Sequence, residues 1–220
     1  MSDTATVAVV DYGMGNLRSV EKALERVGAA AEITSDHARI RGAEGIVLPG
    51  VGAFPKAMRN LRERGLDTLL LELATAGTPL LGICLGLQLL FERSSENEGE
   101  EGLGLLPGHV ERLPAPSLKV PLIGWAPVSW RKRSPLVEQL PDQCPFYFVH
   151  SFAPVEVEAD DVLGATEYGL PFVCAVERAN VFGVQFHPEK SSSAGQRLLR
   201  NFTAICAPVG TAPAEAPAGA

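Results

Sequence analysis

Features that would indicate a secreted, metal-binding or membrane protein are missing from this chain of 220 residues. Its cysteines form no CxxC pair, which disfavours both a disulfide framework and a zinc site. No basic segment followed by a long apolar one stands at the N-terminus, so we expect no signal peptide. No apolar run reaches the length of a membrane span. We therefore expect a cytoplasmic protein whose four cysteines, Cys84, Cys144, Cys174 and Cys206, are mostly buried as small apolar side chains.

Positive charge is also scarce. The chain has 19 Lys and Arg against 26 Asp and Glu, a formal net charge of -7, and no block of basic residues. This disfavours nucleic acid and anionic membranes as partners. A hydrophobic content of 46% over this length suits one domain with a sizeable core. We assign that domain to residues 1–206, because residues 207–220 are nearly all Ala, Pro, Gly and Thr and are predicted to be a disordered tail.

Hydrophobic periodicity predicts an α/β fold. In the first half, uniformly apolar strands alternate with helices, the pattern of a parallel sheet covered on both faces. We expect Asn16 to cap the first helix and His37 to lie in a polar loop. Later strand-like runs separated by turn residues predict additional antiparallel strands in the C-terminal half. The expected strands are 6–11, 31–34, 45–48, 79–83, 109–113, 127–130, 146–152, 162–166, 172–176 and 181–186, and the expected helices are 17–27, 53–64, 66–76, 84–91 and 193–206.

The segment Gly82-Ile83-Cys84-Leu85-Gly86 has the form of a nucleophile elbow. It follows an apolar strand and opens a helix, so the thiol of Cys84 would lie at a helix N-terminus that favours the thiolate. The N–H of Leu85 is then a candidate oxyanion donor. An isolated cysteine is more often a buried structural residue, but the flanking glycines and the strand-to-helix switch favour catalysis here.

A thiol nucleophile needs a base and a group that orients the base. In the segment 182–189 (FGVQFHPE), Pro188 favours extended geometry at His187, which would point His187 and Glu189 to the same side. Glu189 could then accept a hydrogen bond from the imidazole and stabilise the imidazolium. The other histidines, His37, His109 and His150, are interpreted as structural or surface residues.

A third segment, Pro49-Gly50-Val51-Gly52, ends an expected strand. Its glycines let a backbone N–H near Val51 and Gly52 turn toward the thiol, which would provide a second oxyanion donor. On its own this pattern is no more than a β-turn. A dinucleotide fingerprint beginning at Gly13-x-Gly15 fails, because Arg18 occupies the third glycine position.

In this order, PGVG, GICLGLQLLF and GVQFHPEKS resemble the triad (class I) glutamine amidotransferases over about residues 6–206. The resemblance implies that Cys84 is the nucleophile, His187 the acid and base, and Glu189 the residue that orients it, with no metal or organic cofactor. It also implies which residues hold glutamine, through side chains or backbone: Gly52, Gln88, Glu96, Ser151 and Phe152.

Within that family, the segments VAVVDYGMGNLRSV, PGVGAF and FVHSF are similar to the glutaminase subunits of imidazole glycerol phosphate synthases. The resemblance implies a heterodimer with a (β/α)8-barrel cyclase that consumes the ammonia in histidine biosynthesis. It places near that interface the residues Asn16, Trp125, Tyr147 and Lys190. One departure is that Leu122 and Ala126 stand where the family pattern has His and Asn, so coupling to the partner is expected to differ in detail.

Three alternatives remain. A glutaminase subunit of another synthase, or a stand-alone γ-glutamyl hydrolase, would share the same triad. A second family of cysteine proteins also places Cys on an elbow, but usually with His directly after it, where this chain has Leu85. A protein without enzymatic activity would be indicated by the loss of a triad member, and none is lost.

Overall fold

The computed structural model describes residues 4–115 and 118–207. In this part of the chain no helix is both long and apolar enough to cross a membrane. The predicted tail lies outside the described residues from position 208 onward.

Strands and helices alternate through the first half. The elements there are β1 (Thr6–Val10), α1 (Leu17–Arg26), β2 (Ala30–Thr34), α2 (His37–Arg41), β3 (Gly45–Gly50), α3 (Phe54–Glu63), α4 (Leu66–Thr75), β4 (Leu80–Cys84) and α5 (Leu85–Leu89). Strands dominate the second half, which ends with one long helix. Its elements are β5 (Phe91–Ser94), β6 (Glu100–Glu101), β7 (Leu106–Arg112), β8 (Leu122–Trp130), β9 (Gln143–His150), β10 (Phe152–Val155), β11 (Val162–Tyr168), β12 (Leu170–Arg178), β13 (Val181–Val184) and α6 (Ser192–Cys206).

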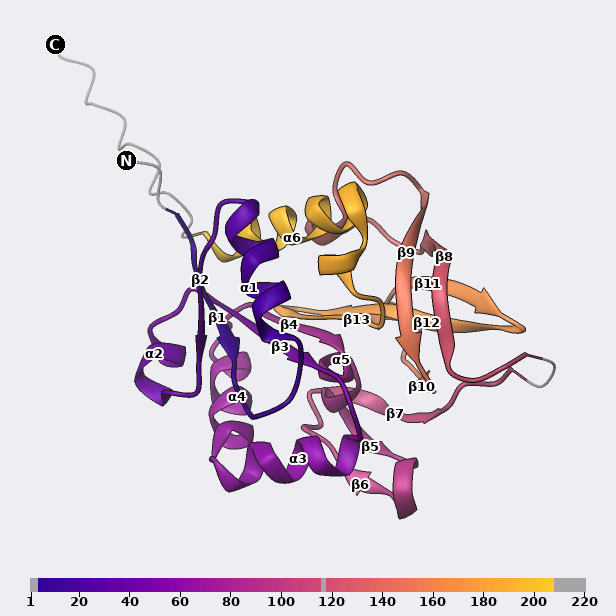
Figure 1. Cartoon of the computed structure of the whole chain (residues 1–220), viewed down its shortest axis with the longest axis horizontal. Coiled ribbons are helices and arrows are strands. Elements are labelled where there is room, and N and C mark those ends of the chain that lie inside the picture. Colours follow the sequence, from indigo (N-terminus) through magenta and orange to yellow (C-terminus); the bar gives the residue numbers. More distant parts are fainter. Residues whose placement is uncertain (1–3, 116–117, 208–220) are drawn as a thin grey trace, which may run out of the picture.

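A nine-stranded sheet forms the centre of the molecule, in the order β2-β1-β3-β4-β13-β12-β11-β8-β9. The first five strands of that order are parallel and the remaining pairings are antiparallel, as the sequence predicted. Helices α1 and α6 cover one face and α3 to α5 the other (Figure 1). Two apolar cores follow, one on each face of the sheet, which is why the central strands are buried throughout.

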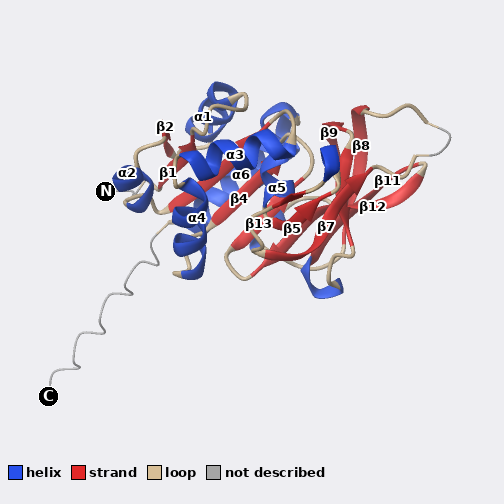
Figure 2. Ribbon diagram, turned by 90° about the horizontal axis from the view of Figure 1, so that it is seen from below, coloured by secondary structure: helices blue, strands red, loops and turns tan. Residues whose placement is uncertain are grey.

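A smaller sheet of order β10-β7-β5-β6 lies on the same side as α3 to α5 (Figure 2). Strands β5 and β6 were not predicted, because two short and largely polar strands carry no periodic signal. The helix after Cys84 was expected to reach Phe91, whereas α5 ends at Leu89 and Phe91 already belongs to β5. The N–H of Leu103 donates a hydrogen bond of 2.8 Å to the carbonyl of Leu89, the last residue of α5.

Three other expectations about local structure were wrong. His37 begins the short helix α2 instead of lying in a loop, because the Asp36 carboxylate accepts hydrogen bonds from two N–H groups of its first turn. Asn16 occupies the N-cap position of α1, but its side chain makes no capping hydrogen bond. The expected strand 146–152 is two strands, β9 and β10, which belong to different sheets and are separated at Ser151.

Parallel pairing decides where the three motifs meet. Strands β3, β4 and β13 lie side by side, with Gly50 opposite Cys84 and Val184 opposite Ile83. Because the carboxyl ends of parallel strands share one edge of a sheet, the segments that follow these strands converge there. They are the turn from Gly50 to Gly52, the elbow at Cys84 and the segment from Gln185 to Glu189.

Candidate active site

Cys84 has a strained backbone at the junction of β4 and α5. Its φ of 56° and ψ of -108° lie in a region that non-glycine residues rarely adopt. The glycines on either side permit close packing. A Cβ on Gly82 would come within 2.7 Å of the Gly86 backbone, and one on Gly86 within 1.7 Å of the Leu48 carbonyl oxygen. Close packing of the helix on the strands therefore holds the elbow, and the Cys84 residue is only 5% exposed.

A cavity of about 300 Å³ opens beside this thiol. The predicted nucleophile, the predicted oxyanion residues and the five predicted substrate residues all line it. These are Cys84, Val51, Gly52, Leu85, Gln88, Glu96, Ser151 and Phe152. The remaining lining residues, Pro121, Val149 and His150, were not predicted as site residues.

His187 and Glu189 form a buried pair near Cys84. The His187 Nδ1 to Glu189 Oε1 distance is 2.8 Å, with side-chain exposures of 5% and 1%. The predicted contact is present, but the reason given for it was wrong. Pro188 to Lys190 form one 3-10 turn, so the chain curls to bring the two side chains together rather than alternating as a strand. Because Pro has no N–H and a fixed φ, it readily opens such a turn.

The surroundings of His187 favour its charged form. Burial opposes the imidazolium, but contact with the Cys84 sulfur and the hydrogen bond to Glu189, with the negative charges of both, raise the pKa of His187 to about 9. The ring is therefore protonated at neutral pH, the state that pairs with a thiolate and can give a proton to a leaving group.

The end of β3 is held by a buried tyrosine, Tyr12, that was not among the predicted site residues. The Tyr12 hydroxyl donates a hydrogen bond of 2.8 Å to the Pro49 carbonyl, and burial together with the nearby Cys84 raises the pKa of Tyr12. A Cβ on Gly50 would lie 2.2 Å from that hydroxyl. Gly52 has a φ of 114°, and a Cβ there would meet the Met14 Cε at 2.7 Å. The loop that follows β1 thus packs directly against the turn that borders the cavity.

Two polar side chains of the cavity are fixed by backbone groups. Gln88 Nε2 donates to the Phe152 carbonyl at 2.9 Å. Glu96 Oε2 accepts the N–H of Phe54, the first residue of α3, at 2.9 Å. The carboxylate therefore lies at a helix N-terminus, where the helix dipole stabilises negative charge.

His150 lines the cavity, contrary to the expectation that it is merely structural or on the surface. Its Nδ1 lies 2.9 Å from the Phe152 carbonyl, which can only accept, so Nδ1 carries the proton. Burial, with a smaller contribution from the charge of His187, lowers the pKa of His150 to about 4. Its Nε2 is buried without a hydrogen-bond partner among the described residues. No pattern in the residues beside His150 signals this position in the sequence.

Three of the four predicted interface residues lie on connected segments. Trp125 on β8 is 52% exposed, and its ring packs edge-on against Tyr147 of β9 with centroids 6.0 Å apart. The backbone of Tyr147 bonds the His187 N–H at 2.8 Å and the Ser191 Oγ at 3.0 Å. Lys190 is exposed in the turn between those two contacts. Asn16, also exposed, lines a separate surface hollow with Leu17 and Arg18.

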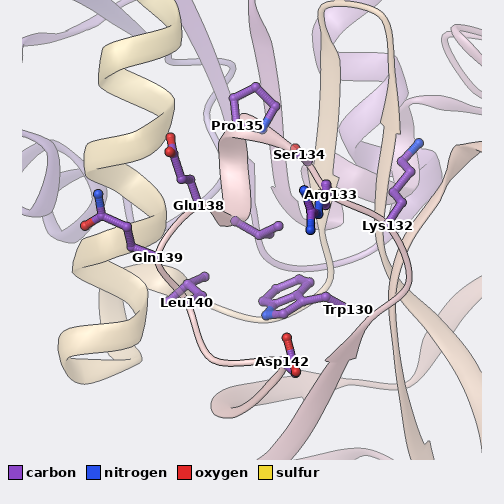
Figure 3. Close-up of a pocket in the computed structure, with 10 residues that line it drawn as sticks. Trp130, Lys132, Arg133, Ser134, Pro135, Glu138, Gln139, Leu140 and Asp142 are labelled. Carbon is purple, nitrogen blue, oxygen red and sulfur yellow. The ribbon is translucent and has the colours of Figure 1, made fainter.

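A larger cavity, of about 540 Å³, lies where β8 ends and the connection to β9 begins. Figure 3 shows Trp130 near its centre, with Glu138, Gln139 and Asp142 around it. Lys132 is held by the carbonyls of Asp160 and Glu177. No cysteine or histidine lines this cavity, and none of the predicted site residues does. Within residues 4–115 and 118–207, no cluster of three or more His, Cys, Asp or Glu is placed to hold a metal ion.

The family model of the class-I glutamine amidotransferases matches residues 8–206. The chain belongs to this family. Related proteins named imidazole glycerol phosphate synthase subunit HisH come from Moorella thermoacetica, at 52% identity over 94% of this chain and 98% of that protein, and from Salinibacter ruber, at 48% identity over 90% and 93%. The same name is carried by a Bacillus cereus protein at 48% identity over 90% and 94% of the two chains.

Solved structures of low sequence identity share the fold of this amidotransferase. PurLQS from Thermotoga maritima aligns with a TM-score of 0.74 at 20% identity, over 92% of this chain and 99% of that one. A crystal structure of another glutamine amidotransferase aligns with a TM-score of 0.72 at 24% identity, over 90% and 98%. The α/β architecture predicted from the sequence is therefore confirmed.

Proposed function

We propose that this amidotransferase hydrolyses glutamine to glutamate and ammonia with Cys84 as nucleophile, His187 as acid and base, and Glu189 as the residue that orients His187. The observation that carries the proposal is a strained cysteine beside a cavity, in contact with an imidazolium that a buried carboxylate holds. Such an arrangement performs nucleophilic catalysis of acyl transfer.

In the first step the Cys84 sulfur attacks the side-chain carbonyl carbon of glutamine. A C–S bond forms, and the carbonyl electron pair moves to oxygen. We propose that backbone N–H groups at Leu85 and near Val51 and Gly52 bind this oxyanion. Loss of one such donor typically costs roughly 100- to 1,000-fold in rate. The oxyanion then collapses, the C–N bond breaks, and His187 gives its proton to the leaving nitrogen, which departs as ammonia.

In the second step water cleaves the thioester. His187, now neutral, takes a proton from the water as its oxygen bonds to the carbonyl carbon. Collapse breaks the C–S bond and releases glutamate, so that thiolate and imidazolium are restored. Glutamine and water are consumed, and glutamate and ammonia are formed.

Polar groups that line the cavity are proposed to bind the α-ammonium and α-carboxylate groups of glutamine. Glu96 uses Oε2 on the Phe54 N–H, which leaves Oε1 for the α-ammonium group of glutamine. We assign Gln88 and Gly52 to the same end of the substrate. We assign the backbone of Ser151 and Phe152 to its α-carboxylate, since these two residues line the cavity together.

The ammonia is proposed to pass to a barrel-shaped cyclase partner that makes imidazole glycerol phosphate and an aminoimidazole carboxamide ribotide in histidine biosynthesis. The names of the relatives support this assignment. So does the chemistry, because ammonia released into water at neutral pH is mostly protonated and then is no nucleophile. Four free cysteines fit the reducing cytoplasm, which we propose as the compartment.

We propose that the partner docks on the outward face of β8 and β9. Ile123 is 63% and Trp125 52% exposed there, and neighbouring large apolar side chains on a surface mark interaction sites. Tyr147 joins this face to His187 through its carbonyl. Lys190 and Asn16 are proposed to add contacts at its margin.

The two departures from the family pattern face inward. Leu122 is 5% and Ala126 7% exposed, whereas Ile123 and Trp125 alternate with them on the outer face of β8. Their effect on coupling is therefore proposed to arise from packing of β8 rather than from direct contact with a partner.

The test is glutamate release from glutamine, measured with and without a cyclase subunit carrying its nucleotide ligand. We expect strong stimulation by the liganded cyclase. High release that ignores the cyclase would instead indicate a stand-alone γ-glutamyl hydrolase or the subunit of another synthase. No release in either state would refute glutamine as the substrate.

Replacing Cys84 by Ser tests the nucleophile in the same assay. We expect glutamine-dependent synthesis by the complex to fall by orders of magnitude, while synthesis from added ammonium salt persists. Cys206→Ala is the matched control, because Cys206 is also buried but lies at the end of α6. Glutamine-dependent turnover that survives Cys84→Ser would show that another group attacks the substrate.

A further inference from the structure

One buried amide at the site has two contacts that the triad does not explain. Gln185 directly follows β13 and is 0% exposed. Its backbone N–H bonds the Cys174 carbonyl at 2.8 Å, which fixes the chain to β12, while β13 just before it pairs with β4, the strand that ends at Cys84. Its side chain lies between Gln88 and Cys84. The Gln88 Nε2 to Gln185 Oε1 distance is 3.2 Å, and the Gln185 Nε2 to Cys84 Sγ distance is 3.8 Å.

A chain of donors and acceptors sets the orientation of both amides. The Phe152 carbonyl can only accept, so the NH2 group of Gln88 must face it. The second hydrogen of that NH2 group goes to Gln185, which therefore presents its oxygen to Gln88. The remaining end of Gln185, its NH2 group, then faces the Cys84 sulfur.

Each contact has a consequence for the reaction. Because both hydrogens of Gln88 are committed, its Oε1 stays free as an acceptor for a substrate ammonium group. An N–H aimed at sulfur stabilises the thiolate over the thiol, and in a fully buried place this effect is not screened by water.

We propose that Gln185 is a positioning residue of the glutaminase reaction, which orients Gln88 toward the substrate and donates a hydrogen bond to the Cys84 thiolate. This inference rests on the proposed function, since it assigns Gln185 a part in the same reaction. It concerns a residue two positions before His187 that belongs neither to the triad nor to the lining of the cavity.

Other ionisable groups near the sulfur must stay unchanged in any test of this idea. The imidazole of His187 contacts the sulfur and is bonded to Glu189, and burial together with the charge of Cys84 raises the pKa of Tyr12, which follows β1. His150 and Glu96 line the same cavity. None of them is bonded to the side chain of Gln185 among the described residues, so a neutral substitution at Gln185 leaves all five in place.

The decisive variant is Gln185→Met, which is unbranched and similar in size but has no N–H and no strong acceptor. The pH dependence of Cys84 alkylation by iodoacetamide, followed by mass spectrometry of the Cys84 peptide, reports the thiolate. We expect its midpoint to move to higher pH, because the variant lacks the N–H that faces the sulfur. In the liganded complex with the cyclase, kcat/KM for glutamine should fall about 10- to 100-fold, with KM raised.

A double-mutant cycle with Gln88→Met separates the two tasks. With Gln88 already replaced, Gln185→Met should raise KM no further but should still move the alkylation midpoint. Asn180→Leu is the matched control. Asn180 is an amide in the turn just before β13 that bonds two backbone carbonyls, so its loss is expected to lower stability without moving either readout.

Thermal unfolding first shows whether each variant is folded. If Gln185→Met does not fold, Gln185→Leu is used in its place. An alkylation midpoint and a KM equal to those of the wild type would overturn the role of Gln185. Failure of the proposed function looks different. It would appear as wild-type protein that does not hydrolyse glutamine, while the alkylation midpoint still tests the contact between Gln185 and sulfur.

Discussion

Glu189→Gln is the change whose effect follows most directly from the geometry. Glu189 is bonded at 2.8 Å to the ring of His187, both side chains are almost fully buried, and the substitution keeps the shape of the side chain while removing its charge. The amide oxygen can still accept from Nδ1–H. We therefore expect the fold to persist and the electrostatics of His187 to change.

The magnitude comes from the pKa of His187, which stands at about 9 against an ordinary value of 6.5. Burial works against this rise, so the contacts with Cys84 and Glu189 must supply all of it. A hydrogen bond to a charged group contributes roughly 1.5–3 kcal/mol, which corresponds to about one to two pH units. Without the carboxylate the pKa of His187 should fall to about 7 or 8, so kcat/KM should fall by at most about twofold at pH 7 but by roughly 10- to 100-fold above about pH 9, where the wild type also loses its imidazolium.

The assay is glutamate release by the complex with liganded cyclase, over a pH range that covers both limbs of kcat/KM. Because imidazolium is the active form, the basic limb should move to lower pH in Glu189→Gln. The control is Glu111→Gln. Glu111 and His109 on β7 are also a His and a Glu two residues apart, and Glu111 Oε1 lies 3.0 Å from His109 Nε2. If Glu189→Gln left both kcat/KM and the pKa of its basic limb unchanged, Glu189 would have no part in the mechanism.

Two further predictions concern stability. Burial lowers the pKa of His150 to about 4. Between about pH 4 and 6.5 the imidazole is therefore protonated in the unfolded chain and neutral in the folded one. The free energy of unfolding should fall by up to about 3 kcal/mol as the pH is lowered through this range. The raised pKa of His187 has the opposite effect. Its contribution to the free energy of unfolding, up to about 3 kcal/mol, is fully present below about pH 6.5 and is lost as the pH rises through about 9. Urea unfolding across pH should thus show a maximum near the ordinary histidine pKa, and a flat profile would contradict both assignments. Gly86→Ala should lower the free energy of unfolding by roughly 3 kcal/mol or more, because the new Cβ would lie 1.7 Å from a carbonyl oxygen. Gly42→Ala is the control, since Gly42 has a φ of -83° and a Cβ there would have its nearest contact at 3.4 Å. Thermal unfolding of this control should be nearly unchanged.

Much of the fold was predictable because its signals are local. The alternation of apolar strands with amphipathic helices located β1 to β4 and α1, α3 and α4 to within a few residues. The missed elements are short or polar, such as α2 with five residues and β6 with two, and exist because neighbouring segments pair with or cap them. Strand β8 begins at Leu122 rather than at 127, because pairing with β9 along its whole length extends it.

By itself, the sequence determined the chemistry available to this protein. Glycines at 82 and 86 around Cys84 act on the backbone beside them, so the elbow could be deduced from the chain, whereas Pro188 was expected to extend the backbone and instead opens a 3-10 turn. Only the tertiary structure decided which distant groups surround that chemistry. Parallel pairing of β4 with β13 carries Gln185 to the Cys84 sulfur, and the end of β9 brings His150 into the cavity. Nothing in the residues flanking Gln185 or His150 encodes those contacts, because each depends on strands that meet only when the sheet is complete.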